Sequence, residues 1–176
     1  MPAMTQAETQ AQVLQIVQNL SERQLDFKIK PYRWSISQTL EHLSAVDSLT
    51  RTLIEAALGK PAGLKESAWK DRDDALLDQV RNREVALKAP EVIQPSEATD
   101  HDDVFRWLKE SRQRLLAFAA STDAPLRSFC VAHPVFGELD CYQWLLAMGA
   151  HFERHLEQMN VVIELNDLLL SLSGGA

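Results

Sequence analysis

Apolar residues recur every three to four positions in four long segments of this chain, and this periodicity is the strongest constraint on its fold. In the first segment the apolar positions are Val13, Ile16, Val17 and Leu20, which share one face of an α-helix. No long stretch alternates apolar and polar residues as a half-buried strand does. The sequence therefore predicts an all-α protein.

Two of the predicted helices begin at a capping box, in which a polar cap residue precedes a glutamine by three positions. Ser35 and Gln38 have this spacing, and so do Asp140 and Gln143. Each side chain of such a pair can bond the backbone N–H of the other residue. The second helix should run to about Leu58, because a glycine and a proline follow it.

The remaining helix limits are set by weaker signals. Thr5 is a candidate cap for the first helix and Thr99 for the third, since both side chains can accept from an early helical N–H. The fourth helix should continue to about Leu165. The tail "SLSGGA" (171–176) should be frayed, as chain ends commonly are.

The segments between the helices are irregular. Residues 60–98 predict a short helix near Leu76–Val80 and then an extended crossover marked by Pro90 and Pro95. The segment "CVAHPVFGELD" (130–140) predicts a turn-rich link. Four long helices with one long crossover between the second and third predict a four-helix bundle.

Length and composition bound the class of protein. A chain of 176 residues predicts one domain over 1–176, with a core from about 5 to 165. The net charge of −7 argues against a nucleic-acid-binding surface. No apolar run approaches the roughly 20 residues that span a bilayer, and the polar start differs from a secretion signal. We therefore expect a cytoplasmic protein with no membrane partner, whose Cys130 and Cys141 are reduced.

Two histidines four residues apart stand in "MGAHFERHLEQM" (148–159). Successive helical residues turn by about 100°, so His155 lies about 40° from His151 on the same face. Glu153 lies about 200° from His151 and should point away. The segment therefore differs from the H-E-x-x-H signature of zinc proteases, whose general base shares the face of the metal.

The face that carries this histidine pair is mostly apolar, so it should turn toward the bundle interior. His42 in the second helix also lies on a largely apolar line. A buried polar group without a partner costs several kcal/mol, so three inward imidazoles need an explanation. One explanation is a hydrogen-bonded core cluster that uses Gln38 and Gln158; the other is a metal site.

Three neutral imidazoles suit a divalent transition metal such as zinc, nickel, iron or manganese. They leave coordination positions free, as catalytic sites do, and the metal then lowers the pKa of a bound water or thiol. Gln38 and Gln158 are candidates to orient the imidazoles from one turn away. Glu41 points about 100° aside from His42; it is a weak candidate for a catalytic base and equally a plain flanking residue. His133 is a candidate fourth ligand or substrate contact, although fixing a turn is the simpler role.

Three quoted segments together resemble the DinB superfamily in its YfiT-like branch. They are "WSISQTLEHL" (34–43), "APEVIQP" (89–95) and "HPVFGELDCYQWLLAMGAHFERHLEQM" (133–159). The resemblance implies a four-helix bundle with a long crossover between helices two and three, and frequently a homodimer. It also implies a metal held by three histidines, which correspond to His42, His151 and His155.

The resemblance leaves three functions open. Relatives are often described as metal-dependent hydrolases acting on small molecules. Others are thiol S-transferases that use a low-molecular-weight thiol such as bacillithiol or mycothiol, and such an activity needs a cationic or polar clamp, for which Arg112 and Arg114 are candidates. The third function is a non-catalytic metal-binding module associated with stress. Fold likeness supports the metal site better than it supports any one substrate.

Overall fold

The computed structural model describes residues 6–61, 66–84, 88–97 and 100–173. The elements in chain order are α1 (Gln6–Val17), α2 (Glu22–Asp26), α3 (Ile36–Leu58), α4 (Asp73–Arg81), η1 (Glu91–Ile93), α5 (His101–Ser121), η2 (Leu126–Ser128), β1 (Cys130–His133), β2 (Gly137–Asp140) and α6 (Cys141–Ser173).

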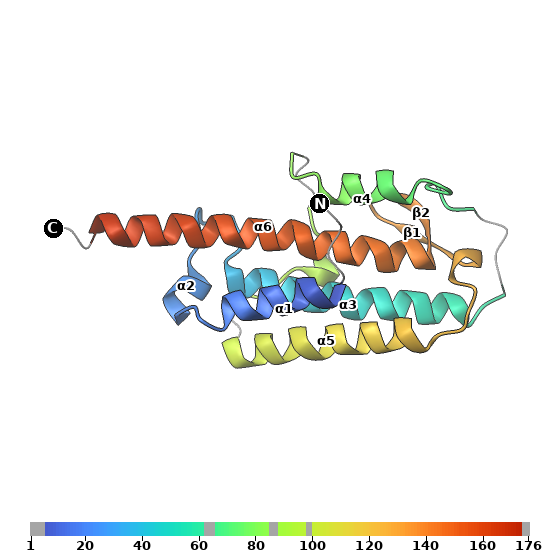
Figure 1. The fold of residues 1–176 in the computed structure, drawn as a ribbon, viewed down its shortest axis with the longest axis horizontal. Helices are drawn as coiled ribbons and strands as arrows, with labels where there is room; N and C mark the ends of the chain where they lie inside the picture. Colours follow the sequence, from blue (N-terminus) through green and yellow to red (C-terminus); the bar gives the residue numbers. More distant parts are fainter. Residues whose placement is uncertain (1–5, 62–65, 85–87, 98–99, 174–176) are drawn as a thin grey trace.

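Helices α1, α3, α5 and α6 run along the long axis of the molecule and form the bundle (Figure 1). Helix α3 packs against α5 and α6, and α1 packs against α6 and α5. The connection from α3 to α5 carries α4, which packs on α6, and the single turn η1, which contacts α3. The predicted four-helix bundle with a long crossover between its second and third helices is confirmed.

The two predicted capping boxes are present. The backbone N–H of Gln38 donates to Ser35 Oγ, and that of Ser35 donates to Gln38 Oε1, each over 3.2 Å. Gln143 N–H donates to Asp140 Oδ1 over 2.7 Å, with the reciprocal bond at 3.2 Å. Helix α3 ends at Leu58 as predicted. Local capping signals were therefore enough to place the helices that carry the histidines.

The predicted end of the fourth helix is wrong, because α6 continues beyond Leu165 to Ser173. The added turns still have contacts: Asn166 is buried, and Gln24 Nε2 in α2 donates to Asp167 Oδ1 over 3.1 Å. The prediction of a frayed tail is thus wrong for residues 171–173, which belong to α6.

Three other terminal predictions fall on residues outside the described part of the chain. They concern the frayed residues 174–176 and the two threonine caps, Thr5 and Thr99. The described cap of α5 is Asp100, whose carboxylate accepts from the backbone N–H groups of Asp102 and Asp103.

A small antiparallel hairpin stands where a turn-rich link was predicted. Strands β1 and β2 pair from Cys130 with Asp140 to His133 with Gly137. Each strand has four residues, which is too short for alternation to separate it from a turn. Gly137 has a φ of +73°, a left-handed conformation that glycine adopts without strain at the end of a hairpin turn.

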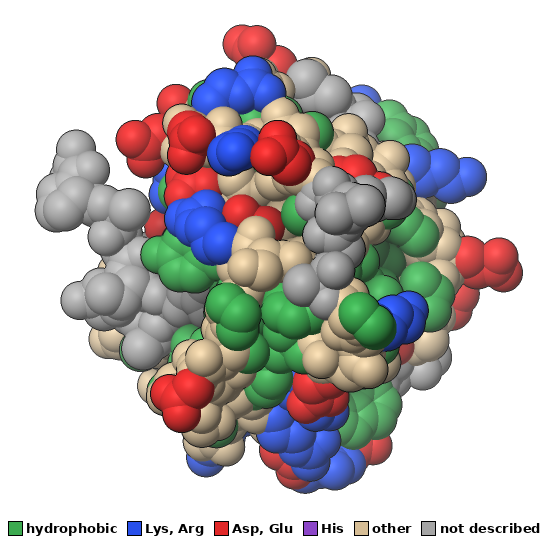
Figure 2. Space-filling view, turned by 90° about the vertical axis from the view of Figure 1, so that its right-hand side faces the viewer, with side chains coloured by type: hydrophobic (Ala, Val, Ile, Leu, Met, Phe, Trp, Pro, Cys, Tyr) green, Lys and Arg blue, Asp and Glu red, His purple; other side chains and the backbone are tan. Residues whose placement is uncertain are grey.

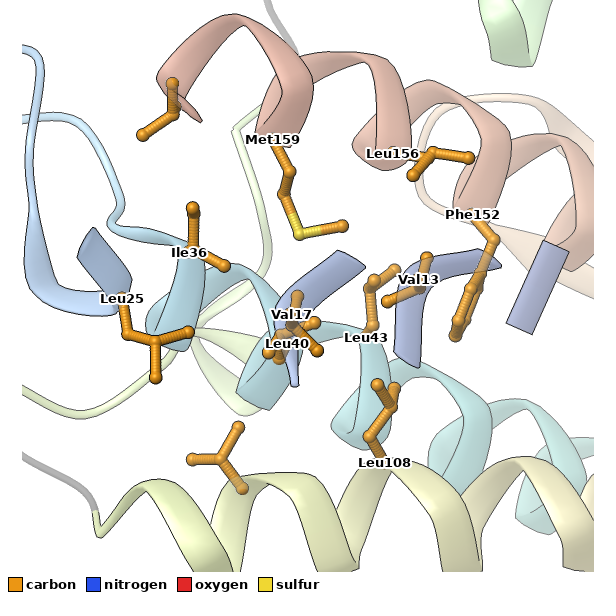
Figure 3. Close-up of a cluster of buried hydrophobic side chains, with 12 residues drawn as sticks. Val13, Val17, Leu25, Ile36, Leu40, Leu43, Leu108, Phe152, Leu156 and Met159 are labelled. Carbon is orange, nitrogen blue, oxygen red and sulfur yellow. The ribbon is translucent and has the colours of Figure 1, made fainter. Parts of the chain in front are cut away.

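The bundle interior holds two clusters of buried apolar side chains. The first draws on α1, α2, α3, α5 and α6, and Figure 3 shows its side chains directed toward one another between these helices. The second lies toward α4 and the hairpin. Along α3 the first cluster ends at Leu43 and the second begins at Val46; along α6 they meet between Ala150 and Phe152. His42 and His151 therefore lie close to the junction of the two clusters.

The surface is mixed in character. On the end of the molecule seen in Figure 2, acidic and basic side chains surround apolar ones, and none of the coloured side chains is a histidine. Leu168, Leu169 and Leu172, near the end of α6, are more than half exposed. None of the helices in the described part of the chain combines the length and apolar character needed to cross a membrane.

Candidate metal centre

The structure brings His42 of α3 together with His151 and His155 of α6. One nitrogen from each ring lies within 4.8 Å of the other two. Nε2 of His42 is 3.1 Å from Nε2 of His151. Imidazole nitrogens bound to one zinc ion at about 2.0–2.1 Å would be separated by about 3.3 Å in a tetrahedral arrangement. The separation of His42 and His151 is close to that value, and all three nitrogens lie within 4.8 Å of one another.

A backbone carbonyl orients the ring of His42. Nδ1 of His42 lies 2.7 Å from the carbonyl oxygen of Ile93 in η1. A carbonyl only accepts, so Nδ1 carries the hydrogen and the lone pair of Nε2 faces His151. Metal-binding histidines are commonly oriented in this way. Sequence patterns gave no sign of Ile93, because its contribution comes from the backbone.

Glu41 and Gln38 fasten the crossover beside His42. The carboxylate of Glu41 accepts from the backbone N–H of Ser96 over 3.2 Å and from its hydroxyl over 3.1 Å. Gln38 Nε2 donates to the carbonyl of Ser96 over 2.9 Å. The structure therefore places Gln38 on the crossover, and the orienting contact to His42 comes from Ile93 instead. The carboxylate of Glu41 is likewise turned toward Ser96.

Burial keeps the three imidazoles neutral. Desolvation lowers the pKa of His42, and the hydrogen bond to Ile93 partly opposes this shift. It lowers the pKa of His155 to about 3, although Gln158 lies close enough to favour the protonated ring. Desolvation and the neighbouring histidines hold the pKa of His151 well below its ordinary value. All three rings are therefore in the form that binds metals at pH 7.

The three rings differ in accessibility and in hydrogen bonding. His42 and His155 are buried, at 3% and 7% exposure, whereas His151 is only partly buried. Nδ1 of His155 is buried without a hydrogen-bond partner of good geometry. Converging neutral nitrogens, one fixed tautomer and one unsatisfied nitrogen fit a divalent transition metal. Of the two glutamines expected in a purely hydrogen-bonded cluster, Gln38 bonds instead to Ser35 and Ser96, whereas Gln158 lies beside His155.

Two residues beside the histidines fasten α6 to α4. Glu153 accepts from Arg81 of α4 over 2.6 Å, so it faces α4 and not His42 of α3, in agreement with its predicted direction. Arg154 donates to the carbonyls of Val80 and Asn82 at the end of α4. The charge of Arg154 also lowers the pKa of His151 and His155. Arg154 could not be singled out from the sequence, since a charged residue between two histidines carries no signal of its own.

His133 ends strand β1 and fixes the hairpin turn. Its Nδ1 accepts the backbone N–H groups of Val135 and Phe136 over 3.1 and 3.2 Å, which confirms the predicted turn role. This nitrogen is consequently not available as a metal ligand. The ring stacks on Phe136 and lies beside Trp144, with centroid distances of 4.7 Å to both.

The two arginines expected as a thiol clamp lie elsewhere. Arg112 is fully buried, with Nε 3.0 Å from Asp47 Oδ2 and its guanidinium 3.5 Å from the ring centroid of Phe152. Arg114 is exposed and pairs with Glu110 over 2.9 Å. This placement argues against the expected clamp.

Comparison with known proteins gave one family and several similar proteins. The model of the DinB superfamily matches residues 7–159. The uncharacterized protein YuaE of Bacillus subtilis (strain 168) is 28% identical over 149 residues, which cover 84% of this chain and 88% of YuaE.

Two solved structures share the fold. TT2238, described as a four-helix bundle protein, matches with a TM-score of 0.57 and 18% identity, covering 89% of this chain and 93% of TT2238. YfiT from Bacillus subtilis, described as "a probable metal-dependent hydrolase with an unusual four-helix bundle topology", matches with a TM-score of 0.62 and 15% identity, covering 92% of this chain and 83% of YfiT. At these identities the likeness is one of fold.

Proposed function

The chain belongs to the DinB superfamily, and from this premise we propose that it is a metal-dependent hydrolase of a small molecule. His42, His151 and His155 would hold a divalent transition-metal ion. The observation that carries the proposal is the convergence of three neutral imidazoles within 4.8 Å. YfiT, which shares the fold, is described as a probable metal-dependent hydrolase.

An ion held by three imidazoles supplies a Lewis acid with open coordination positions, which lowers the pKa of a bound water or thiol. The chain itself supplies the rest of the site. Ile93 holds the ring of His42, which is only 3% exposed to water. His151 is less buried than the other two histidines, so a substrate would reach the ion from its side. Zinc, nickel, iron and manganese all accept imidazole ligands, so the chain fits any of them.

Two alternatives are less well supported. A thiol S-transferase would share the three histidines, but Arg112 is held in the core by Asp47 and Arg114 is paired with Glu110. A non-catalytic metal-binding module would not need a ligand that reaches the surface, whereas His151 is only partly buried. Hydrolysis is therefore the first function to test.

Metal content and turnover test the proposal together. Protein purified without a histidine tag is expected to contain one metal ion per chain, measured by elemental analysis. His151→Ala should lose the ion, whereas His101→Ala should keep it, because His101 lies apart from the cluster and pairs with Asp26. Metal loading that is equal in the two variants would contradict the assignment.

A panel of small esters, amides and other electrophiles, assayed with and without added thiols, separates the activities. Turnover without thiol supports hydrolysis, and turnover that requires thiol supports transfer. The homodimer and the cytoplasmic location remain proposals from the resemblance and the sequence. Sedimentation analysis of the purified protein and cell fractionation test them.

A further inference from the structure

Trp34 packs against one of the three histidines of the candidate metal centre. The centroid of its ring lies 4.8 Å from that of His42, and the two ring planes are tilted by 44°. The ring centroids of His151 and His155 lie 5.3 and 5.1 Å from that of His42. Aromatic rings at such distances attract one another beyond the burial of their area. The ring of His42 is therefore in contact with two histidines and one indole.

Local backbone contacts set the position of Trp34 at the start of α3. The next residue is Ser35, the cap of α3, whose backbone N–H donates to Gln38 Oε1 over 3.2 Å. The turn before Trp34 is closed by a hydrogen bond of 2.9 Å from the backbone N–H of Arg33 to the carbonyl of Lys30. None of these contacts involves the three histidines, so the indole is placed without their help.

The imidazole of His42 is held by contacts of two kinds. Its Nδ1 donates to the carbonyl of Ile93 over 2.7 Å, which fixes the tautomer. One hydrogen bond still leaves the ring some freedom to rotate about the line that joins the two atoms. Trp34, packed against the ring, restricts this rotation. Ligands of a metal site are best held when their rotamers are locked by packing as well as by hydrogen bonds.

We propose that Trp34 is a positioning residue of the metal centre, which keeps the ring of His42 in its metal-binding orientation before the ion arrives. The inference rests on the proposed function, because His42 must be a ligand. Trp34 itself offers no ligand atom, since its Nε1–H is a donor only. A ring that is already oriented loses little freedom on binding, so removing the indole should weaken the affinity for metal.

Zinc titration of the metal-free protein by calorimetry tests this role. We expect Trp34→Ala to bind zinc about threefold to tenfold more weakly than the original chain, which is the range of one aromatic ring contact. Trp34→Phe should recover most of the affinity, because it keeps a ring beside His42. Trp107→Ala is the matched control and should bind zinc as the original chain does. Trp107 of α5 is 37% exposed, and within the described part of the chain its ring packs against none of the three histidines.

Nickel binding gives a spectroscopic signal that a tryptophan with a merely structural role would not give. A bound nickel ion quenches the fluorescence of nearby indoles. The chain has four tryptophans, and we expect Trp34→Phe to reduce the quenching by more than Trp107→Phe does. Urea unfolding of the metal-free variants records any loss of stability separately from the loss of metal affinity.

Equal zinc affinity in the original chain and Trp34→Ala would overturn this inference and leave the proposed function intact. An equal loss in Trp34→Ala and Trp107→Ala would do the same. If Trp34→Ala does not fold, Trp34→Phe decides, because nickel quenching that this substitution leaves unchanged would place the indole away from the ion. Absence of zinc binding by the original chain would overturn the proposed function, and this inference with it.

Discussion

Replacing His155 with leucine is expected to stabilise the metal-free protein and to abolish its response to metal. His155 is 7% exposed, and its Nδ1 is buried without a hydrogen-bond partner of good geometry. An unsatisfied buried polar atom costs about 1–3 kcal/mol. Leucine is close to histidine in volume, so repacking should cost little. We expect the free energy of unfolding at pH 7 to rise by about 1–3 kcal/mol, reduced by whatever Gln158 contributes.

The gain should grow as the pH falls. Burial lowers the folded-state pKa of His155 to about 3, below the value of about 6.5 in an unfolded chain. Below pH 6.5 the unfolded state binds a proton that the folded state does not. The free energy of unfolding of the original chain therefore falls by up to about 1.4 kcal/mol per pH unit until about pH 3. Leucine removes this loss. The difference between the two proteins should therefore widen by about 2 kcal/mol between pH 7 and pH 5.

Urea unfolding of chelator-treated proteins at both pH values measures these differences, and repeating it with zinc measures the metal response. Zinc at a hundred times its dissociation constant adds about 2.7 kcal/mol to a chain that binds it. His42→Leu is the matched control: it should also lose the zinc response, but it leaves the carbonyl of Ile93 without its 2.7 Å partner and should destabilise the metal-free protein. A leucine variant at position 155 that is less stable than the original chain would refute the reasoning, as would one that keeps the zinc response.

Three further outcomes are expected. Zinc binding at pH 7 should release well under one proton per histidine, because burial already holds the imidazoles neutral; calorimetry in buffers of different ionisation enthalpy measures this, and release of about three protons would contradict it. Glu41→Gln should keep zinc affinity within about threefold, because the amide oxygen still accepts from Ser96; lost turnover with intact zinc binding would instead identify Glu41 as a base. Asp47→Ala should lower the free energy of unfolding by about 3–5 kcal/mol, because the buried guanidinium of Arg112 loses its carboxylate. Joint replacement of Asp47 by leucine and Arg112 by methionine should change the free energy of unfolding little, as measured by urea unfolding. A loss below about 1 kcal/mol for Asp47→Ala would contradict that account.

The parts of the fold that follow from local rules could be predicted from the sequence. Capping boxes placed the starts of α3 and α6, because each box involves residues only three positions apart. Helix geometry also gave the direction of side chains along α6. It placed His151 and His155 on one face, which the structure turns toward His42, and Glu153 on the opposite face, where it pairs with Arg81.

Features that depend on contacts distant in the sequence could not be predicted in this way. The carbonyl of Ile93 reaches His42 across 51 positions, and backbone groups leave no mark in a residue pattern. The hairpin is held by residues far along the chain, such as Trp69. Near the end of α6, Asp167 accepts a hydrogen bond from Gln24 of α2, 143 positions away. In each case the contacting residue lies too far along the chain for helical or strand periodicity to reveal it.

The long crossover between α3 and α5 is fixed at two points, and the segment between them orients His42. One end is fixed where Arg154 binds the carbonyls that end α4, and the other where Glu41 and Gln38 bind Ser96. Between these points η1 presents the carbonyl that orients His42. A short link between α3 and α5 would leave the histidines in place, because the helices alone set their direction, but it would remove the group that fixes the tautomer of His42. The length of the connection is thus part of how the fold aims the nitrogen that we propose as a metal ligand.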